Sequence, residues 1–316
     1  MAASSTTTVL SPRTPIFIAG PTASGKSALA LALAEQVNGE IITVDSMQVY
    51  RGLDIGTAKP TAEDCARVKH HLLDVCDLRQ AFDAARFVEL AQAAVQAISA
   101  RGKTPIFCGG TGLYFKAYLE GLSEAPTTDN ALRDALAATP LETLLAELAE
   151  RDPTTFAKID RQNPRRVIRA VAVIRLTGRP FSEQQAAWNA NANANPAPIY
   201  CLSRPAEDLN PRIHARVDEM FARGLVAETR ALLPLGLAEN PFALQAIGYR
   251  QVVEHLRGER GLAETIELVK TRTRQFAKRQ LTWFRRQNRC VWLPVGPNDT
   301  PADLLRRAPL AAYLPH

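Results

Sequence analysis

Residues 16–27 read Ile-Phe-Ile-Ala-Gly-Pro-Thr-Ala-Ser-Gly-Lys-Ser, four apolar residues followed by a glycine-containing turn. The last eight match the G-x-x-x-x-G-K-[ST] pattern of a phosphate-binding loop, or P-loop. Its glycines let backbone N–H groups turn toward an anion, and the following helix directs its positive end at the same point. Lys26 adds a charge, and the Ser27 hydroxyl can ligate Mg²⁺. The predicted phosphate site consists of Gly20, Pro21, Thr22, Ala23, Ser24, Gly25, Lys26 and Ser27.

Strand and helix signals alternate around this loop. Short apolar runs predicted to be strands lie at 16–19, 41–44, 105–108 and 199–202, and the helical pattern that follows ends at another apolar run, 291–293. Between them, 27–37 and 83–100 carry apolar residues at helical spacing. Strands separated by helices indicate a parallel sheet with helices on both faces. We therefore expect an α/β fold with a P-loop NTPase-like parallel sheet core flanked by helices.

The sequence changes character near Gly121. From 126 to 185 it is rich in helix-forming residues and has no strand signal, and 189–198 is a low-complexity Asn/Ala/Pro stretch. We expect a discontinuous P-loop-type core at 14–122 and 197–316, interrupted by a helical insertion at 123–196. The Ser/Thr-rich residues 1–13 are expected to form a disordered leader.

Positive charge is concentrated in two segments. The net charge is +6, from 38 Lys and Arg against 32 Asp and Glu. Residues 270–289 contribute +8 and residues 151–179 contribute +6, which leaves −8 for the rest of the chain. Such asymmetry is typical of a protein that binds a polyanion, although two solvated helix faces would give the same pattern.

The cysteines and the hydropathy of the sequence indicate the cellular compartment of the protein. The five cysteines are scattered, with no C-x-x-C pair, which argues against a disulfide framework or a zinc site and fits a reducing cytosol. The longest apolar run, 28–34, is far too short to cross a bilayer. The N-terminus lacks the apolar region of a secretory signal. We expect a cytoplasmic monomer without a membrane segment.

A P-loop often belongs to a nucleotide hydrolase or kinase, which needs a Walker-B acid at the end of an apolar strand. The strand predicted at 105–108 runs instead into Gly-Gly-Thr-Gly at 109–112. The strand that ends in an acid is 41–44, followed by Asp45. A pyrophosphate could occupy the loop, but the usual hydrolytic residues are missing.

Six motifs occur in order along the chain: GPTASGKS at 20–27, DSMQVYRGLDIGTAKP at 45–60, HHLLDV at 70–75, GGTGLYFKA at 109–117, QAIGYRQ at 245–251 and TRQFAKRQLTWFR at 273–285. Together they resemble the tRNA dimethylallyltransferase family over nearly all of 16–293. The resemblance implies transfer of a dimethylallyl group from dimethylallyl diphosphate to N6 of the adenosine 3′-adjacent to the anticodon. The tRNAs would read codons that begin with U, and the product would be N6-isopentenyladenosine. It also implies Mg²⁺ as cofactor and the anticodon stem-loop as the bound part of tRNA.

The resemblance implies that Asp45 and Thr111 are catalytic. The adenine amine is a weak nucleophile, because its lone pair is delocalised, and a carboxylate can orient it and accept its proton. Asp45 follows a strand beside the P-loop, where open α/β sheets bind ligands, and a turn cap is its structural alternative. The Thr111 hydroxyl would form a hydrogen bond with the reacting centre; its structural alternative is a hydroxyl that only stabilises its turn. Arg216 would join the P-loop in holding diphosphate, and Ser27 and Asp45 would hold Mg²⁺.

The resemblance also implies that the core at 14–122 and 197–316 is catalytic, that the insertion at 123–196 is a tRNA-binding insertion, and that a set of residues contacts tRNA. Asp45, Ser46, Met47, Gln48 and Thr111 would receive the adenine after it leaves its stack. The other expected contacts are Arg133, Arg165, Arg166, Val167, Ile168, Arg169, Gln245, Ala246, Ile247, Gly248, Tyr249, Arg250, Lys278, Arg279, Gln280, Leu281, Thr282, Trp283, Phe284 and Arg285. For Trp283 and Phe284, packing in the protein core is an equal alternative to stacking on a base.

Three other functions would use some of the same features. A P-loop small-molecule kinase predicts nucleotide turnover and indifference to RNA. A prenyltransferase acting on free adenine nucleotides would leave the helical insertion and the two basic segments without a purpose. A non-catalytic RNA-binding protein would leave Lys26, Ser27 and Asp45 unexplained.

Overall fold

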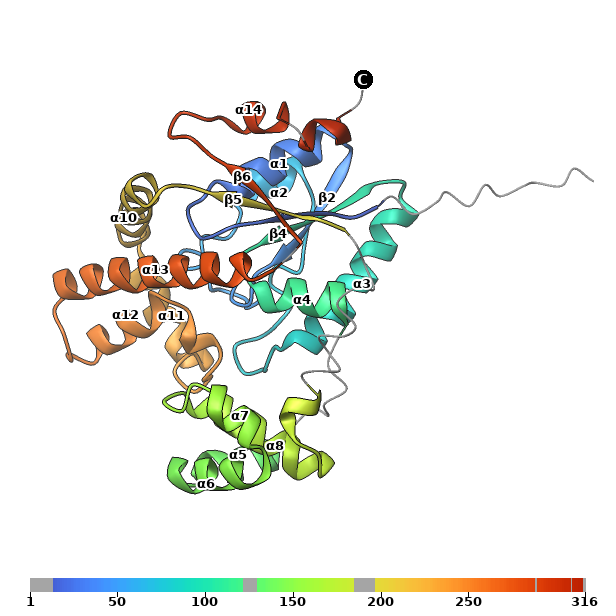
Figure 1. Ribbon diagram of the computed structural model, residues 1–316. Helices are drawn as coiled ribbons and strands as arrows, with labels where there is room; N and C mark the ends of the chain where they lie inside the picture. The colour runs from blue at the N-terminus through green and yellow to red at the C-terminus, as the bar shows by residue number, and fades with distance from the viewer. Residues whose placement is uncertain (1–13, 122–129, 185–196, 288, 308, 315–316) are drawn as a thin grey trace, which may run out of the picture. The chain divides into compact units, whose positions relative to one another are not determined.

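The computed structural model describes residues 14–121, 130–184, 197–287, 289–307 and 309–314 (Figure 1). The chain folds into two compact units, one formed by Met1–Phe115 with Ala197–His316 and the other by Lys116–Pro196. The second unit thus begins inside a helix, seven residues before the start of the insertion expected at 123–196. The leader expected at 1–13 and nearly all of the 189–198 stretch lie outside the described residues.

A six-stranded parallel sheet forms the centre of the first unit. Its order is β3-β2-β4-β1-β5-β6, and every neighbouring pair is parallel. The strands are β1 (Ile16–Ala19), β2 (Gly39–Val44), β3 (His70–His71), β4 (Thr104–Gly109), β5 (Ile199–Ser203) and β6 (Cys290–Pro294). The sequence predicted four of them; β6 was marked only as an apolar run, and β3 was missed because two residues are too few to show a pattern. The predicted parallel sheet core is confirmed.

The sheet is buried because apolar side chains leave it on both faces. Ile16 and Ile18 of β1 pack with Leu29 and Leu33 of α1 (Lys26–Gln36). Phe17, between them in sequence, points the other way and stacks on Phe107 of β4, with ring centroids 4.8 Å apart. Strands covered on both faces have continuous apolar sequences, as these do.

The remaining helices of this unit connect the strands or follow the last one. They are α2 (Ala62–Arg67), α3 (Ala84–Ala100), α4 (Gly112–Glu120, which runs on into the second unit), α10 (Ala206–Ala222), α11 (Leu225–Leu232), α12 (Tyr249–Leu256), α13 (Leu262–Arg285) and α14 (Pro301–Leu305), with 3₁₀ turns η2 (Leu233–Leu235), η3 (Ala243–Gln245) and η4 (Leu310–Tyr313). Figure 1 shows α1 and α14 on one side of the sheet and α13 on the other. α3 begins where the sequence predicted, because the Asp83 side chain caps it by accepting from the Arg86 N–H.

The second unit is helical in its described part. Helices α5 (Asn130–Ala138), α6 (Leu141–Arg151), α7 (Pro153–Lys158) and α8 (Pro164–Thr177) enclose their own apolar core, in which Leu144, Leu148 and Val171 are fully buried. A helical unit without strands agrees with the pattern of 126–185. No helix among the described residues is both long and apolar enough to cross a bilayer.

Candidate active site

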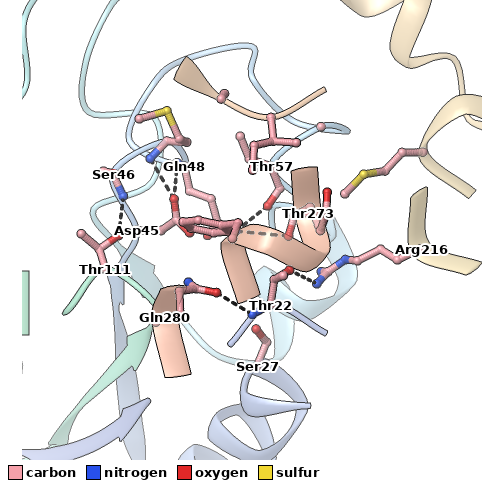
Figure 2. Close-up of a pocket in the computed structure, with 18 of the residues that line it drawn as sticks. Thr22, Ser27, Asp45, Ser46, Gln48, Thr57, Thr111, Arg216, Thr273 and Gln280 are labelled. Atoms are coloured by element: carbon pink, nitrogen blue, oxygen red, sulfur yellow. Dashed lines mark hydrogen bonds between the residues drawn. The ribbon is translucent and has the colours of Figure 1, made fainter. Parts of the chain in front are cut away.

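Three neighbouring strands, β2, β4 and β1, end at one edge of the sheet, and the segments that follow them line a pocket of about 340 Å³ (Figure 2). Asp45 follows β2, Thr111 lies just beyond β4, and Lys26 follows β1. Ligands of open α/β sheets bind at such carboxyl ends. Of the residues expected in the site, the pocket gathers Thr22, Lys26, Ser27, Asp45, Ser46, Met47, Gln48, Thr111, Arg216, Gln245, Ala246, Ile247, Arg279 and Gln280.

The P-loop presents a cation and unpaired amides to the pocket. Gly25 is the N-cap of α1 in a left-handed conformation (φ 96°), and it has no side chain to cap the first turn. The N–H groups of that turn are therefore available to an anion. The Lys26 Nζ donates to the Pro21 carbonyl oxygen at 3.1 Å, and burial lowers the pKa of Lys26. A bound anion would compensate this desolvated ammonium.

Arg216, from α10, lies across the P-loop. Its Nη1 donates to the Thr22 hydroxyl oxygen at 3.4 Å, and Arg212, one turn earlier, donates through Nε to the Ala23 carbonyl at 3.1 Å. Burial lowers the pKa of Arg216, against the opposing charges of Glu219 and Asp45. Two half-buried cations, Lys26 and Arg216, thus line the same pocket, which suits a polyvalent anion.

Asp45 uses one carboxylate oxygen to hold its own turn. Oδ1 accepts from the N–H groups of Met47 at 2.8 Å and Gln48 at 3.2 Å, which is the turn cap considered above. Within the described part of the chain, Oδ2 accepts no hydrogen bond. Burial raises the pKa of Asp45, opposed by those two backbone bonds and by the charges of Lys26 and Arg216. A raised pKa makes the carboxylate a better proton acceptor.

Thr111 is bonded to the segment that carries Asp45. Its Oγ1 accepts from the Ser46 N–H at 3.1 Å, which leaves the hydroxyl proton to be donated elsewhere. The backbone N–H groups of Gly110 and Thr111 both donate to the Val44 carbonyl at 3.2 Å. The turn after β2 and the turn after β4 are thereby fixed to each other.

The pocket suits a magnesium ion shared with a substrate better than one held by protein alone. Among the described residues, no group of three or more His, Cys, Asp and Glu side chains converges on one point. Ser27 and Asp45 do line the same pocket. Mg²⁺ is commonly held by one or two protein ligands together with substrate phosphates, so this donor set fits it.

Comparison with known proteins identifies the family. The family model described as IPP transferase matches residues 48–287. The chain belongs to the IPP transferase family. It is 49% identical over 288 residues to tRNA dimethylallyltransferase 1 of Trichlorobacter lovleyi, covering 90% of this chain and 94% of that protein.

Two solved structures of the family are also similar. The full-length tRNA isopentenylpyrophosphate transferase of Bacillus halodurans has a TM-score of 0.69 at 36% identity, over 94% of both chains. A eukaryotic dimethylallyltransferase, described as acting on tRNA, has a TM-score of 0.75 at 29% identity, over 90% of this chain and 74% of that one.

Several residues expected to contact tRNA are buried instead. Val167 is fully buried in the core of the helical unit, and Phe284 packs edge-on against Phe115 with ring centroids 6.0 Å apart. Tyr249 is also fully buried; its hydroxyl donates to the Glu228 carboxylate and accepts from the Gly56 N–H at 3.1 Å. These side chains stabilise the fold and are not available for direct contact with RNA.

The exposed residues of the same segments alternate with the buried ones. On α13, the exposed residues are Lys278, Arg279, Thr282 and Arg285, while Leu281 is half-buried and packs against the cluster of Leu209, Ile213 and Ala277. On α8, Arg165 and Arg166 are exposed, and Ile168 and Arg169 are half-buried. Gln245 and Arg250 lie on the surface near the buried Gly248, and nothing is described of the Arg133 side chain.

Sequence reasoning missed the apolar wall and one arginine. Val217, Met220, Val269 and Phe276, from α10 and α13, line the pocket, but their helical spacing is indistinguishable from core packing. Arg204 is buried; its Nε donates to the Ser24 carbonyl at 3.0 Å, and its Nη1 donates to Asp208 at 2.5 Å. No local motif surrounds Arg204, so nothing in the sequence singled it out.

Proposed function

We propose that the chain is a tRNA dimethylallyltransferase, which moves a dimethylallyl group from dimethylallyl diphosphate to N6 of the adenosine 3′ of the anticodon. The tRNAs would be those that read codons beginning with U. One observation carries the proposal: the P-loop, two half-buried cations and a carboxylate of raised pKa line a single pocket, within the IPP transferase family. In the reaction, the N6–carbon bond forms, the carbon–oxygen bond to diphosphate breaks, and N6 loses a proton.

The P-loop side of the pocket would hold the diphosphate. Lys26, Arg216 and the first-turn amides of α1 face the charge that accumulates on the leaving group. Fixed cations and N–H donors stabilise that charge more in the transition state than in the substrate. Ser27 would hold Mg²⁺ together with the diphosphate, and the ion would neutralise part of its charge. We leave Asp45 out of the ligand set, because Oδ2 cannot bind the ion and accept a proton together.

The turn after β2 would hold the adenine. Asp45 Oδ2 would accept the N6 proton, and the Thr111 hydroxyl would donate to the base. Ser46, Met47 and Gln48 line the same part of the pocket. The adenine must leave its stack to enter, as for other enzymes that modify a base.

The apolar wall would take the hydrocarbon. Val217, Met220, Val269 and Phe276 line the pocket together with the P-loop residue Thr22. A five-carbon allylic chain gains from this burial at roughly 0.8 kcal/mol per methylene-sized group. Such a wall suits the hydrocarbon part of a prenyl donor.

Exposed arginines and lysines on both units would contact the tRNA backbone. The candidates are Arg165 and Arg166 on α8 and Lys278 and Arg285 on α13. We propose that the enzyme acts as a monomer, in the cytoplasm with its tRNA substrate.

The test supplies radiolabelled dimethylallyl diphosphate with bulk tRNA or with AMP, and with or without ATP, followed by digestion to nucleosides. We expect label in N6-isopentenyladenosine from tRNA alone, abolished by EDTA and by Lys26→Ala, and indifferent to ATP. Label on AMP but not tRNA would identify a free-nucleotide prenyltransferase. A requirement for ATP, with phosphate transferred, would identify a kinase.

A further inference from the structure

The Gln280 side chain lies between the two turns that bound the pocket. It is buried, with 7% of its surface exposed, in the C-terminal half of α13. Its Oε1 accepts from the Thr22 N–H at 2.9 Å, and its Nε2 donates to the Gly110 carbonyl at 3.0 Å. Figure 2 shows the amide beside the P-loop residue Thr22. One amide thus joins the loop after β1 to the loop after β4.

The surrounding packing enforces this position. A Cβ at Gly110 would lie only 2.2 Å from Gln280 Nε2, so the glycine leaves room for the amide. A Cβ at Gly112 would likewise lie 2.2 Å from the Trp283 ring, one turn along the same helix. Ala277 and Phe284, on the same face of α13, are buried. Only a side chain with a donor and an acceptor on one planar group satisfies both loops here.

The two joined loops serve opposite halves of the proposed reaction. Thr22 accepts from Arg216, on the diphosphate side. Gly110 precedes Thr111, which accepts from Ser46 next to Asp45, on the adenine side. The bond pair therefore sets the separation between the leaving group and the nucleophile. A misplacement of about 1 Å between reacting groups can cost about 100-fold in rate.

We propose that Gln280 is a positioning residue, which fixes the P-loop to the loop of residues 109–112, and that it is not a tRNA contact. The expected loss of rate rests on the proposed function, whereas the expected link between the two loops rests on the two hydrogen bonds alone. It separates Gln280 from its neighbours Lys278 and Arg279, which remain available to RNA.

Two substitutions of different severity test the role. Gln280→Glu keeps the shape and the acceptor for Thr22, but it places a carboxylate oxygen against the Gly110 carbonyl. Gln280→Met keeps the length and removes both bonds. Gln275→Glu is the matched control, because it makes the same change on the same helix at an exposed glutamine. Where Gln280→Met does not fold, the isosteric Gln280→Glu carries the test.

Three quantities are measured: the single-turnover rate with both substrates saturating, the Kd for tRNA, and backbone hydrogen exchange of peptides covering 20–25 and 108–113. We expect both Gln280 variants to lose about 10- to 100-fold in rate with the Kd within about twofold of wild type. Exchange should quicken at 20–25 in Gln280→Met and at 108–113 in both variants. Gln275→Glu should change none of the three.

Two results would overturn the proposal. The first is a weakened Kd for tRNA with the rate retained, since this is the signature of an RNA contact. The second is unaltered hydrogen exchange in both loops of both variants. If the wild type transfers no dimethylallyl group while exchange responds as expected, the proposed function fails and the structural link stands.

Discussion

In the proposed reaction, Asp45 would use its two carboxylate oxygens for two different tasks. Oδ1 caps the turn after β2 through Met47 and Gln48, and Oδ2 is left to accept a proton. The turn cap and the general base, which the sequence left as alternatives, are therefore compatible. The sequence could locate Asp45 at a strand end, but it could not show the burial that raises the pKa.

A pH profile follows from that raised pKa. The carboxyl must be deprotonated to accept the N6 proton, so activity is absent below its pKa and appears as the pH rises through it. Because burial moves this pKa above the ordinary 3.8, the acid limb of kcat/KM should lie above pH 3.8. The measurement is kcat/KM for tRNA from about pH 4.5 upward, within the range where the protein stays folded. Asp45→Asn should lose the limb, and an unchanged limb in that variant would assign it to another group.

Single stretches of the sequence contain both residues that stabilise the fold and residues on the surface. In 245–250, Gln245 and Arg250 lie on the surface. Between them, the buried Tyr249 hydroxyl forms hydrogen bonds with Glu228 and Gly56, which stabilise the fold. The same division occurs on α13, where Gln280 and Phe284 face inward and Arg285 outward. A motif match cannot distinguish residues that stabilise the fold from residues on the surface, because both kinds are adjacent in the same motif. Only the helical register, which the fold sets, shows which side chains face inward.

Neighbouring substitutions on α12 test that division. Tyr249→Phe removes a buried hydroxyl that bonds Glu228 and Gly56, so it should lower the free energy of unfolding by about 1–3 kcal/mol and leave the Kd for tRNA unchanged. Arg250→Ala should weaken tRNA binding and leave stability nearly unchanged, since the Arg250 side chain in its pair with Glu254 is exposed. Denaturant titration and tRNA binding are measured for both. A loss of tRNA binding in Tyr249→Phe together with a loss of stability in Arg250→Ala would contradict this division of roles.

The basic face of α8 gives a salt prediction. Arg165 and Arg166 are exposed, and each phosphate contact releases counterions from RNA. Changing both to alanine should weaken tRNA binding and reduce the slope of log Kd against log salt by about one unit or less per contact. The matched control is Arg223→Ala with Arg257→Ala, two arginines on the surface outside both basic segments. Equal losses in the two double variants would show that the α8 segment is an ordinary solvated face.

For the whole molecule, the sequence predicted the parallel sheet, and the structure gives the order of its strands. β1, β2 and β4 were each recognisable as apolar runs bounded by glycine or a charge. Their adjacency as β2-β4-β1, which gathers Asp45, Thr111 and Lys26, depends on crossover connections that no local pattern encodes. The apolar wall from α10 and α13 was missed for the same reason, because its residues meet only in the folded chain.

The proposed function requires that this one pocket transfer a dimethylallyl group to a particular adenosine of tRNA, with Asp45 as base. The most direct test is single-turnover transfer from labelled dimethylallyl diphosphate to an unmodified tRNA, with wild type and Asp45→Asn. The wild type should label only the adenosine 3′ of the anticodon, and a tRNA with guanosine there should stay unlabelled. Asp45→Asn should be slower by about 10²–10⁴-fold with an unchanged Kd for tRNA. Label elsewhere in the tRNA, or an Asp45→Asn rate within a few-fold of wild type, would contradict the account.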